Sequence, residues 1–253
     1  GGVLAVMFNL LAPATQQQVT SVNGAGFQPD EAVAPDSIVS GFGSGLATGT
    51  LIASALPLPT DLLGTSVTVT DSQGVARDAS LFAVTPGQVN FMMPADTATG
   101  VATVTVHSGA GGDLIGAVQV ASVGPGIFQA LPTNFAVGSA LRVQPGNVRT
   151  ETQLVGFENG QFVAMPVNMG DAADEVFLSL YATGIRRRNK QNAVMATVGG
   201  EAAIVEYADA QMQFVGLDQI VLRVPHSLAG RGLVDIVITV DGKTANAVRV
   251  HFQ

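Results

Sequence analysis

The stretch Phe82-Ala-Val-Thr-Pro-Gly-Gln-Val-Asn-Phe-Met-Met-Pro94 is the best guide to the fold of this chain, because a related stretch recurs later in the chain. Its counterpart is Phe214-Val-Gly-Leu-Asp-Gln-Ile-Val-Leu-Arg-Val-Pro225, in which Gln219 takes the place of Gln88. A repeat of about 130 residues is too long for a solenoid unit and fits two copies of one domain. The sequence therefore predicts a tandem architecture.

The match extends on both sides of these stretches. Upstream, Ser40-Gly-Phe-Gly-Ser-Gly-Leu46 corresponds to Ser179-Leu-Tyr-Ala-Thr-Gly-Ile185, and downstream Gly100 corresponds to Gly232. The domain boundary is expected at Gly124-Pro-Gly126, because proline removes a backbone donor and glycine permits a sharp change of direction. The predicted organisation is an N-terminal arm at residues 1–18, a first domain at residues 19–124 and a second domain at residues 125–253.

Short apolar or alternating runs, separated by turn residues, predict strands along almost the whole chain. Gly199-Gly200, Asp241-Gly242 and Glu158-Asn-Gly160 are predicted hairpin turns, since glycine, asparagine and aspartate tolerate a positive φ. Helical periodicity is almost absent outside the first residues. The pattern is typical of an antiparallel β-sandwich or barrel.

Composition narrows the classes of function. The 253 residues carry a net charge of −8, and 12% are charged, against about 25% in an ordinary soluble domain. The negative net charge argues against nucleic acid and against an anionic membrane surface as partners. The absence of cysteine excludes disulfides and thiol catalysis. The basic cluster Arg186-Arg-Arg188 is expected in a solvated loop, with a salt bridge to a neighbouring chain as the alternative.

Several strings carry a resemblance to a known family: Ser21-Val-Asn-Gly-Ala-Gly-Phe27, Pro35-Asp-Ser-Ile-Val-Ser40, Pro86-Gly-Gln-Val-Asn-Phe91, Gly124-Pro-Gly-Ile-Phe128 and Tyr181-Ala-Thr-Gly184. The chain resembles, over about residues 20–253, the Solibacter-type uncharacterised C-terminal domain family of secreted acidobacterial proteins. The resemblance implies an extracellular setting and no catalytic residues. It also implies tandem immunoglobulin-like domains. Together with the strand pattern and the apolar N-terminal arm, this gives the predicted fold class: all-β, with two tandem immunoglobulin-like β-sandwich domains behind that arm.

Residues that could carry catalysis are few. His107, His226 and His251 show no metal-ligand spacing with one another. Gly41-Phe-Gly-Ser-Gly45 is one residue out of register with the Gly-x-Ser-x-Gly nucleophile elbow. The chain is therefore predicted not to be an enzyme and to use no cofactor.

Carboxylate clusters are the remaining candidates for a metal site. Asp171, Asp174 and Glu175 are close in sequence and are the calcium candidates, and residues 30–36 contain a second acidic group. Calcium requires six to eight oxygen ligands. Neither group has the Asp-x-Asp-x-Asp-Gly spacing of a calcium loop, so both are expected in solvated turns and no metal site is predicted.

The N-terminal arm lies outside the repeat. Leu4, Val6, Phe8 and Leu10 alternate along one face of a strand, and burying them would stabilise a contact by about 6–12 kcal/mol before entropy. A short helix is the alternative, because a second apolar set aligns with period 3.6: Leu4, Met7, Phe8 and Leu11. The arm is too short to span a bilayer and lacks the basic n-region of a signal peptide. It is expected to pack on its own first domain or to add to the sheet of a neighbouring subunit.

The predicted function is that of an extracellular structural subunit. Strand addition by the arm would join copies of the chain head to tail, and such a contact builds a filament or surface layer. The predicted partners are therefore neighbouring copies in a homo-polymer, with no nucleic acid and no membrane span, and the location is secreted or at the cell surface. The alternative is a cell-surface adhesion or carbohydrate-binding module pair, although the chain has no tryptophan to stack on sugars.

Overall fold

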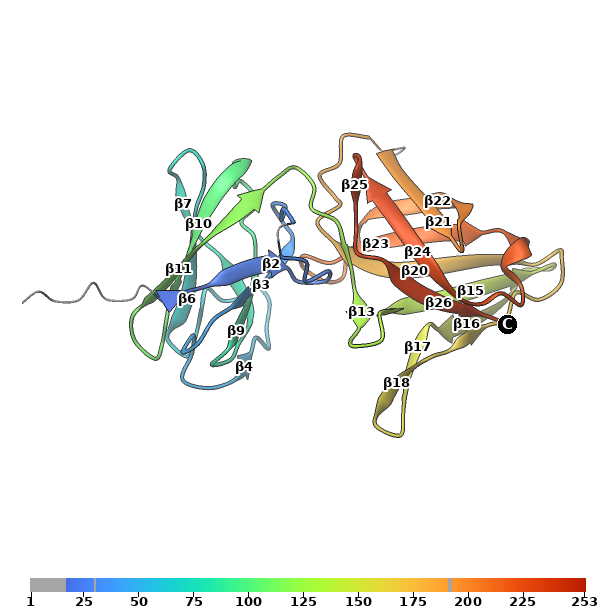
Figure 1. Ribbon diagram of the computed structural model, residues 1–253, viewed down its shortest axis with the longest axis horizontal. Coiled ribbons are helices and arrows are strands. Elements are labelled where there is room, and N and C mark those ends of the chain that lie inside the picture. The colour runs from blue at the N-terminus through green and yellow to red at the C-terminus, as the bar shows by residue number, and fades with distance from the viewer. Residues whose placement is uncertain (1–16, 30, 191–192) are drawn as a thin grey trace, which may run out of the picture.

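The computed structural model describes residues 17–29, 31–190 and 193–253, which form two lobes placed one after the other along the long axis (Figure 1). We call residues 17–122 the first lobe and residues 123–253 the second lobe. Strands build both lobes, and no α-helix occurs among the described residues. The predicted all-β class is confirmed.

The first lobe consists of two separate sheets around one core. One sheet has the order β1-β11-β10-β6-β5, with β7 also paired to β6, and the other has the order β2-β3-β9-β8-β4. The strands are β1 (Gln17–Gln18), β2 (Thr20–Asn23), β3 (Ile38–Phe42), β4 (Leu51–Ile52), β5 (Asp61–Leu62), β6 (Thr65–Thr70), β7 (Ala76–Asp78), β8 (Ser80–Val84), β9 (Gln88–Met92), β10 (Gly100–His107) and β11 (Asp113–Val120).

Alternation of side chains explains why these segments form strands. In β6, Val67 and Val69 are buried while the threonines between and after them are half-buried, and Val104 and Val106 repeat this pattern in β10. Successive residues of a strand point to opposite faces, so valine fills the core and threonine meets water.

The second lobe is one continuous network of pairings in the order β13-β14-β26-β24-β21-β22-β23-β20-β15-β16. Outside this order, β12 pairs with β20, β19 with β26 and β25 with β24, while β17 and β18 form a separate hairpin. The elements are β12 (Gly126–Ile127), β13 (Gln129–Ala130), β14 (Phe135–Ala136), β15 (Gly138–Gln144), β16 (Val148–Gln153), β17 (Val155–Glu158), β18 (Gln161–Ala164), β19 (Pro166–Val167), β20 (Glu175–Thr183), β21 (Val194–Val198), β22 (Glu201–Ala210), β23 (Asp218–Val224), the 3-10 helix η2 (His226–Leu228), β24 (Gly232–Val240), β25 (Lys243–Thr244) and β26 (Val248–Phe252).

Strand β22 makes the second lobe differ from a sandwich of two separate sheets. Its first residues pair with β21, and from Ile204 onward it pairs with β23, with a bulge between Val205 and Tyr207. A bulge bends a strand and increases its twist. The sheet therefore curls from one face of the lobe to the other through β22.

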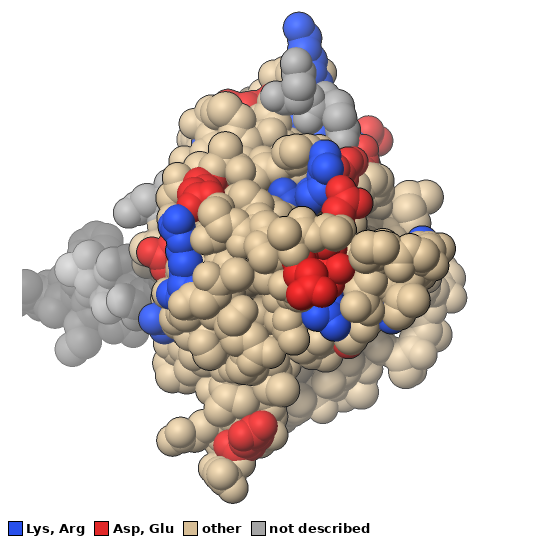
Figure 2. Space-filling view, turned by 90° about the vertical axis from the view of Figure 1, so that its right-hand side faces the viewer, with Lys and Arg blue, Asp and Glu red and all other residues tan. Residues whose placement is uncertain are grey.

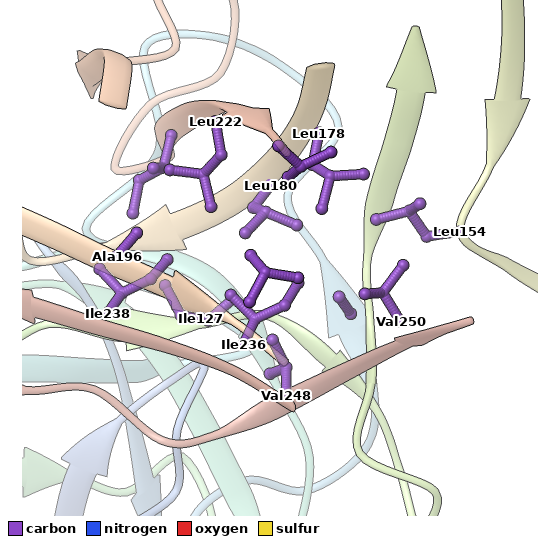
Figure 3. Packing of buried hydrophobic residues seen from close by; sticks show 14 of the residues in the cluster. Ile127, Leu154, Leu178, Leu180, Ala196, Leu222, Ile236, Ile238, Val248 and Val250 are labelled. Atoms are coloured by element: carbon purple, nitrogen blue, oxygen red, sulfur yellow. The ribbon is translucent and has the colours of Figure 1, made fainter. Parts of the chain in front are cut away.

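The core of the second lobe is aliphatic. Figure 3 shows Leu178 and Leu180 of β20 and Leu222 of β23 facing Ile236 and Ile238 of β24 across the lobe. All five side chains are fully buried or nearly so. Close packing of branched aliphatic side chains gives the lobe its own core, separate from that of residues 19–120.

The repeated sequence stretches occupy equivalent places in the two lobes. Matched residues form matched cross-strand pairs: Phe42 with Gln88 and Tyr181 with Gln219, and Ser40 with Asn90 and Ser179 with Val221. Leu46 and Ile185, which end the upstream match, are both fully buried. The sequence repeat is thus also a repeat of strand register.

The hairpin turns follow the predicted chemistry. Asp241 and Gly242 both have positive φ between β24 and β25, and Asn159 and Gly160 do so between β17 and β18. Positive φ at both central residues matches the twist of a two-residue hairpin. These turn predictions are confirmed.

Candidate functional site

The predicted contact residues Leu4, Val6, Phe8 and Leu10 lie outside the described residues, so their docking as a strand stays a prediction. The described residues offer four other places to consider: the acidic and basic clusters, a row of polar groups on one sheet, the joint between the lobes, and the exposed apolar surfaces.

The calcium candidates lie against arginines. The Asp174 carboxylate is 3.9 Å from Nε of Arg142, and Glu175 accepts a hydrogen bond of 3.0 Å from Arg223. Asp171 lies in the same turn, where its backbone carbonyl accepts from the backbone N–H of Asp174. Among the residues that the structure describes, no group of three His, Asp or Glu side chains is arranged to hold a metal ion.

The basic cluster lies in a loop, as predicted, and Arg187 is exposed, but Arg186 and Arg188 are not solvated as expected. Arg186 pairs with Asp218 at 2.7 Å, and Arg188 pairs with Asp209 at 3.1 Å, with the Arg188 side chain almost fully buried. Asp209 lies in β22 and Asp218 begins β23, so the two carboxylates are 21 and 32 residues away from their arginines in the sequence. Such distances hide these pairs from sequence analysis. The loop is held by ion pairs within its own chain.

Asp218, the first residue of β23, is the residue that holds this loop most closely. Its carboxylate also accepts a hydrogen bond of 2.9 Å from the backbone N–H of Ile185, and the residue has no exposed surface. Burial raises the pKa of Asp218 above its ordinary value, and the nearby Arg186 guanidinium opposes that rise. A buried pair of this kind fixes geometry more than it adds stability.

A row of polar side chains crosses one face of the first lobe. His107 Nδ1 lies 2.9 Å from the Asp113 carboxylate, and His107 Nε2 lies 3.3 Å from the Thr68 hydroxyl. The order acid, imidazole and hydroxyl is that of a catalytic triad. However, the Thr68 hydroxyl donates to Asp78, and the side chains of His107 and Asp113 are about half exposed. The row acts as cross-strand polar pairing on an open sheet face.

The joint between the lobes is built around Asn23. Its amide donates a hydrogen bond of 2.8 Å to the Gly124 carbonyl, and its side-chain oxygen accepts from the backbone N–H groups of Ala25 and Gly26. Asn23 is 1% exposed. A Cβ at Gly126 would lie 2.1 Å from the same side-chain oxygen, so only glycine fits there. Asn23 therefore holds the chain at the predicted boundary, Gly124–Gly126, although it lies 101 positions before Gly124.

Two further contacts cross the joint. The Thr183 hydroxyl accepts from the backbone N–H of Ile38 at 2.9 Å and donates to the Gly216 carbonyl at 2.8 Å. Arg187 donates to Asp36 at 2.6 Å, which links the basic cluster to the first lobe. Thr183 is fully buried, so its two hydrogen bonds are shielded from water. These contacts set the relative position of the lobes.

An apolar hollow of about 340 Å³ lies beside this joint. Leu56 and Phe82 line it from the first lobe, and Phe214 and Val215 line it from the second. Phe214 is 65% exposed although it belongs to the repeated stretch.

A hairpin projects from the second lobe and carries an exposed aromatic pair (Figure 1). Phe157 of β17 and Phe162 of β18 pack edge to face with ring centroids 5.1 Å apart. Both rings are exposed. Because a two-stranded hairpin has little core of its own, this pair supplies much of its packing.

A wedge-shaped opening, here called the β21–β22 cleft, lies where β21 and β22 diverge, and it is lined by residues 194–197 of β21 and residues 202, 203 and 205 of β22. Pairing of the two strands ends at Ala196 with Ala203; beyond it, in the described part of the chain, β21 pairs only with β24 and β22 only with β23. The cleft has a volume of about 620 Å³ and an apolar lining that includes Val194, Met195 and Val205.

Comparison with known proteins assigns no relative: no family model matches the chain, and no curated protein matches it. Within the described ranges, no helix is long and apolar enough to cross a membrane.

Proposed function

We propose that the chain is an extracellular structural subunit with two tandem immunoglobulin-like β-sandwich domains, at residues 19–124 and 125–253. Residues 1–18 act as an arm, and addition of its strand to a neighbouring subunit builds a filament or surface layer. The resemblance to secreted acidobacterial domains supports the extracellular setting. The proposal includes no catalytic centre, no cofactor and no nucleic-acid partner.

The observation that carries this proposal is the amount of large apolar side chain left in solvent. Exposed examples occur in loops, strands and hairpins of both lobes: Ile52, Leu56, Phe157, Met195, Met212 and Phe214. Single exposed apolar residues are ordinary, but groups of them on loops and edges are typical of contact surfaces. Burial against another protein explains them.

Low surface charge supports the same conclusion. In Figure 2 the face at the far end of the second lobe is mostly uncharged, with acidic and basic side chains in small separate groups. Such a surface can be buried against a second subunit without a large desolvation cost.

The arrangement of the lobes suits addition of subunits in a line. The described chain begins in β1 at the end of the first lobe that faces away from the second, and it ends in the second lobe at the opposite side of the molecule (Figure 1). A donor segment at one end and acceptor surfaces at the other make a heterologous contact, which does not close.

Deletion of residues 1–14 tests the proposed function. We expect the deleted chain to melt at nearly the wild-type temperature and to remain monomeric in sedimentation and electron microscopy. Phe8→Asp should behave in the same way, whereas the neighbouring control Asn9→Asp, on the other face of the predicted strand, should still assemble. Assembly of the deleted chain would overturn the proposal.

The second candidate, an adhesion module, is favoured by one observation, the exposed Phe157–Phe162 pair on the projecting hairpin. Exposed aromatic rings are common anchors in binding sites. A monomeric native protein that binds a glycan array, and loses that binding on Phe157→Ser, would support adhesion in place of assembly.

A further inference from the structure

We propose that the β21–β22 cleft is the acceptor site for the N-terminal strand of a neighbouring copy of this chain. This inference rests on the proposed function and deepens it, because it assigns the surface on which the arm docks. Three features carry it: the unpaired strand edges of the cleft, its apolar lining, and the absence of charged residues from the arm.

The first feature is the pair of open strand edges. The ladder between β21 and β22 stops at Ala196 and Ala203, while Val194 and Met195 still pair with Val240 and Thr239 of β24. Each strand therefore presents one side without a paired strand in the described structure. An inserted strand could hydrogen-bond to Val194 and Met195 of β21 on one side and to β22 beyond Ala203 on the other, as in strand addition.

The second feature is the lining. Val194 is almost fully buried and belongs to the core of the second lobe, and Val205 packs against that core from the opposite strand. None of the described side chains that line the cleft is charged. Alternate side chains of an inserted strand would extend the existing core, which suits Leu4, Val6 and Phe8 of the arm.

The third feature is the composition of the arm. Residues 1–16 contain no Asp, Glu, Lys or Arg, so no charged side chain of the arm would be buried in the cleft.

A complementation experiment on full-length protein tests the assignment. Met195→Asp places a carboxylate at the mouth of the cleft; Met195 is 64% exposed, so the substitution leaves the core intact. Val101→Asp is the matched control, because Val101 is similarly exposed on β10 of the first lobe. We expect Met195→Asp to raise the concentration needed for assembly at least tenfold and Val101→Asp to leave it unchanged. Thermal melting verifies that both variants fold.

The decisive sample is an equimolar mixture of Met195→Asp, which keeps a functional arm, and Phe8→Asp, which keeps a functional cleft. Each alone should be monomeric, and the mixture should form one-to-one dimers that do not elongate. If Met195→Asp assembles like the wild type, or the mixture stays monomeric, the cleft is not the acceptor, although the arm retains its proposed role. If Phe8→Asp alone assembles, the proposed function fails and the acceptor assignment fails with it.

Discussion

At the scale of single residues, one carboxylate organises a turn in the first lobe. Asp71 accepts hydrogen bonds from the backbone N–H groups of Gln73, Val75 and Ala98, and from the Arg77 guanidinium at 2.6 Å. The bond from Val75 contributes most to lowering the pKa of Asp71 to about 2; burial opposes it, and the other bonds add to it.

This pKa predicts how stability depends on pH. The pKa in the folded state lies below the unfolded value of about 3.9, so the carboxylate stabilises the fold fully above that value and progressively less as the pH falls toward 2. Asp71→Asn should therefore lower the melting temperature at pH 7 by several degrees, and the difference from wild type should shrink between pH 4 and pH 2. Asp96→Asn, at an exposed site, is the control. A difference that does not depend on pH would contradict the assignment.

Asn23 provides the second residue-scale prediction. Asn23→Ala removes one donor and one acceptor from a buried site, and each unsatisfied group costs about 1–3 kcal/mol. We expect denaturant-induced unfolding to show a lower free energy of unfolding for this variant. We also expect faster proteolysis near residues 121–126. Asn189→Ala, at an exposed position, should change neither measurement.

At the scale of elements, the β17–β18 hairpin depends on its two aromatic rings. An edge-to-face pair contributes about 0.5–1.5 kcal/mol beyond the area that it buries. Phe157→Ser should therefore increase hydrogen exchange across β17 and β18 while leaving the global melting temperature nearly unchanged. Val148→Ser on the exposed strand β16 should leave exchange in the hairpin unaltered. Unchanged exchange in Phe157→Ser would show that the rings do not hold the hairpin.

The elements also show what could be predicted from sequence. The turn at Asn159–Gly160 and the matched registers of β3 with β9 and of β20 with β23 follow from local pattern and from the repeat. The β21–β22 cleft could not be predicted, because the point where two strands diverge depends on twist and on a bulge. Likewise, Asp209 and Asp218 have no local signal that marks them as partners of the arginine cluster.

At the scale of the whole molecule, the joint determines how two similar lobes act as one body. The glycine-rich strings around Asn23 and Gly124 were each visible in the sequence, but their contact was not, because it joins residues far apart in the chain. The buried hydrogen bonds of Thr183 should stabilise the joint more than the more exposed ion pair between Arg187 and Asp36 does. Surface ion pairs contribute only about 0–1 kcal/mol.

Substitutions across the joint test this order. Thr183→Val leaves the backbone N–H of Ile38 and the carbonyl of Gly216 without their partner, so it should broaden the distribution of lobe orientations in small-angle X-ray scattering. Arg187→Ala should leave the scattering profile close to that of the wild type. A larger effect from Arg187→Ala would reverse the proposed order of the two contacts.

The hydrogen bonds around Asn23 also affect where the chain undergoes spontaneous deamidation. Asn-Gly sequences deamidate when the glycine nitrogen attacks the asparagine side chain, and the chain has two of them, at Asn23 and Asn159. The Gly24 nitrogen donates its hydrogen to the Ile38 carbonyl at 2.9 Å, and the Asn23 amide is engaged with Gly124, so the attack is blocked there. Asn159 stands exposed at the tip of its hairpin. Over a long lifetime of the protein, spontaneous deamidation would therefore begin at the hairpin tip and spare the joint that holds the lobes together.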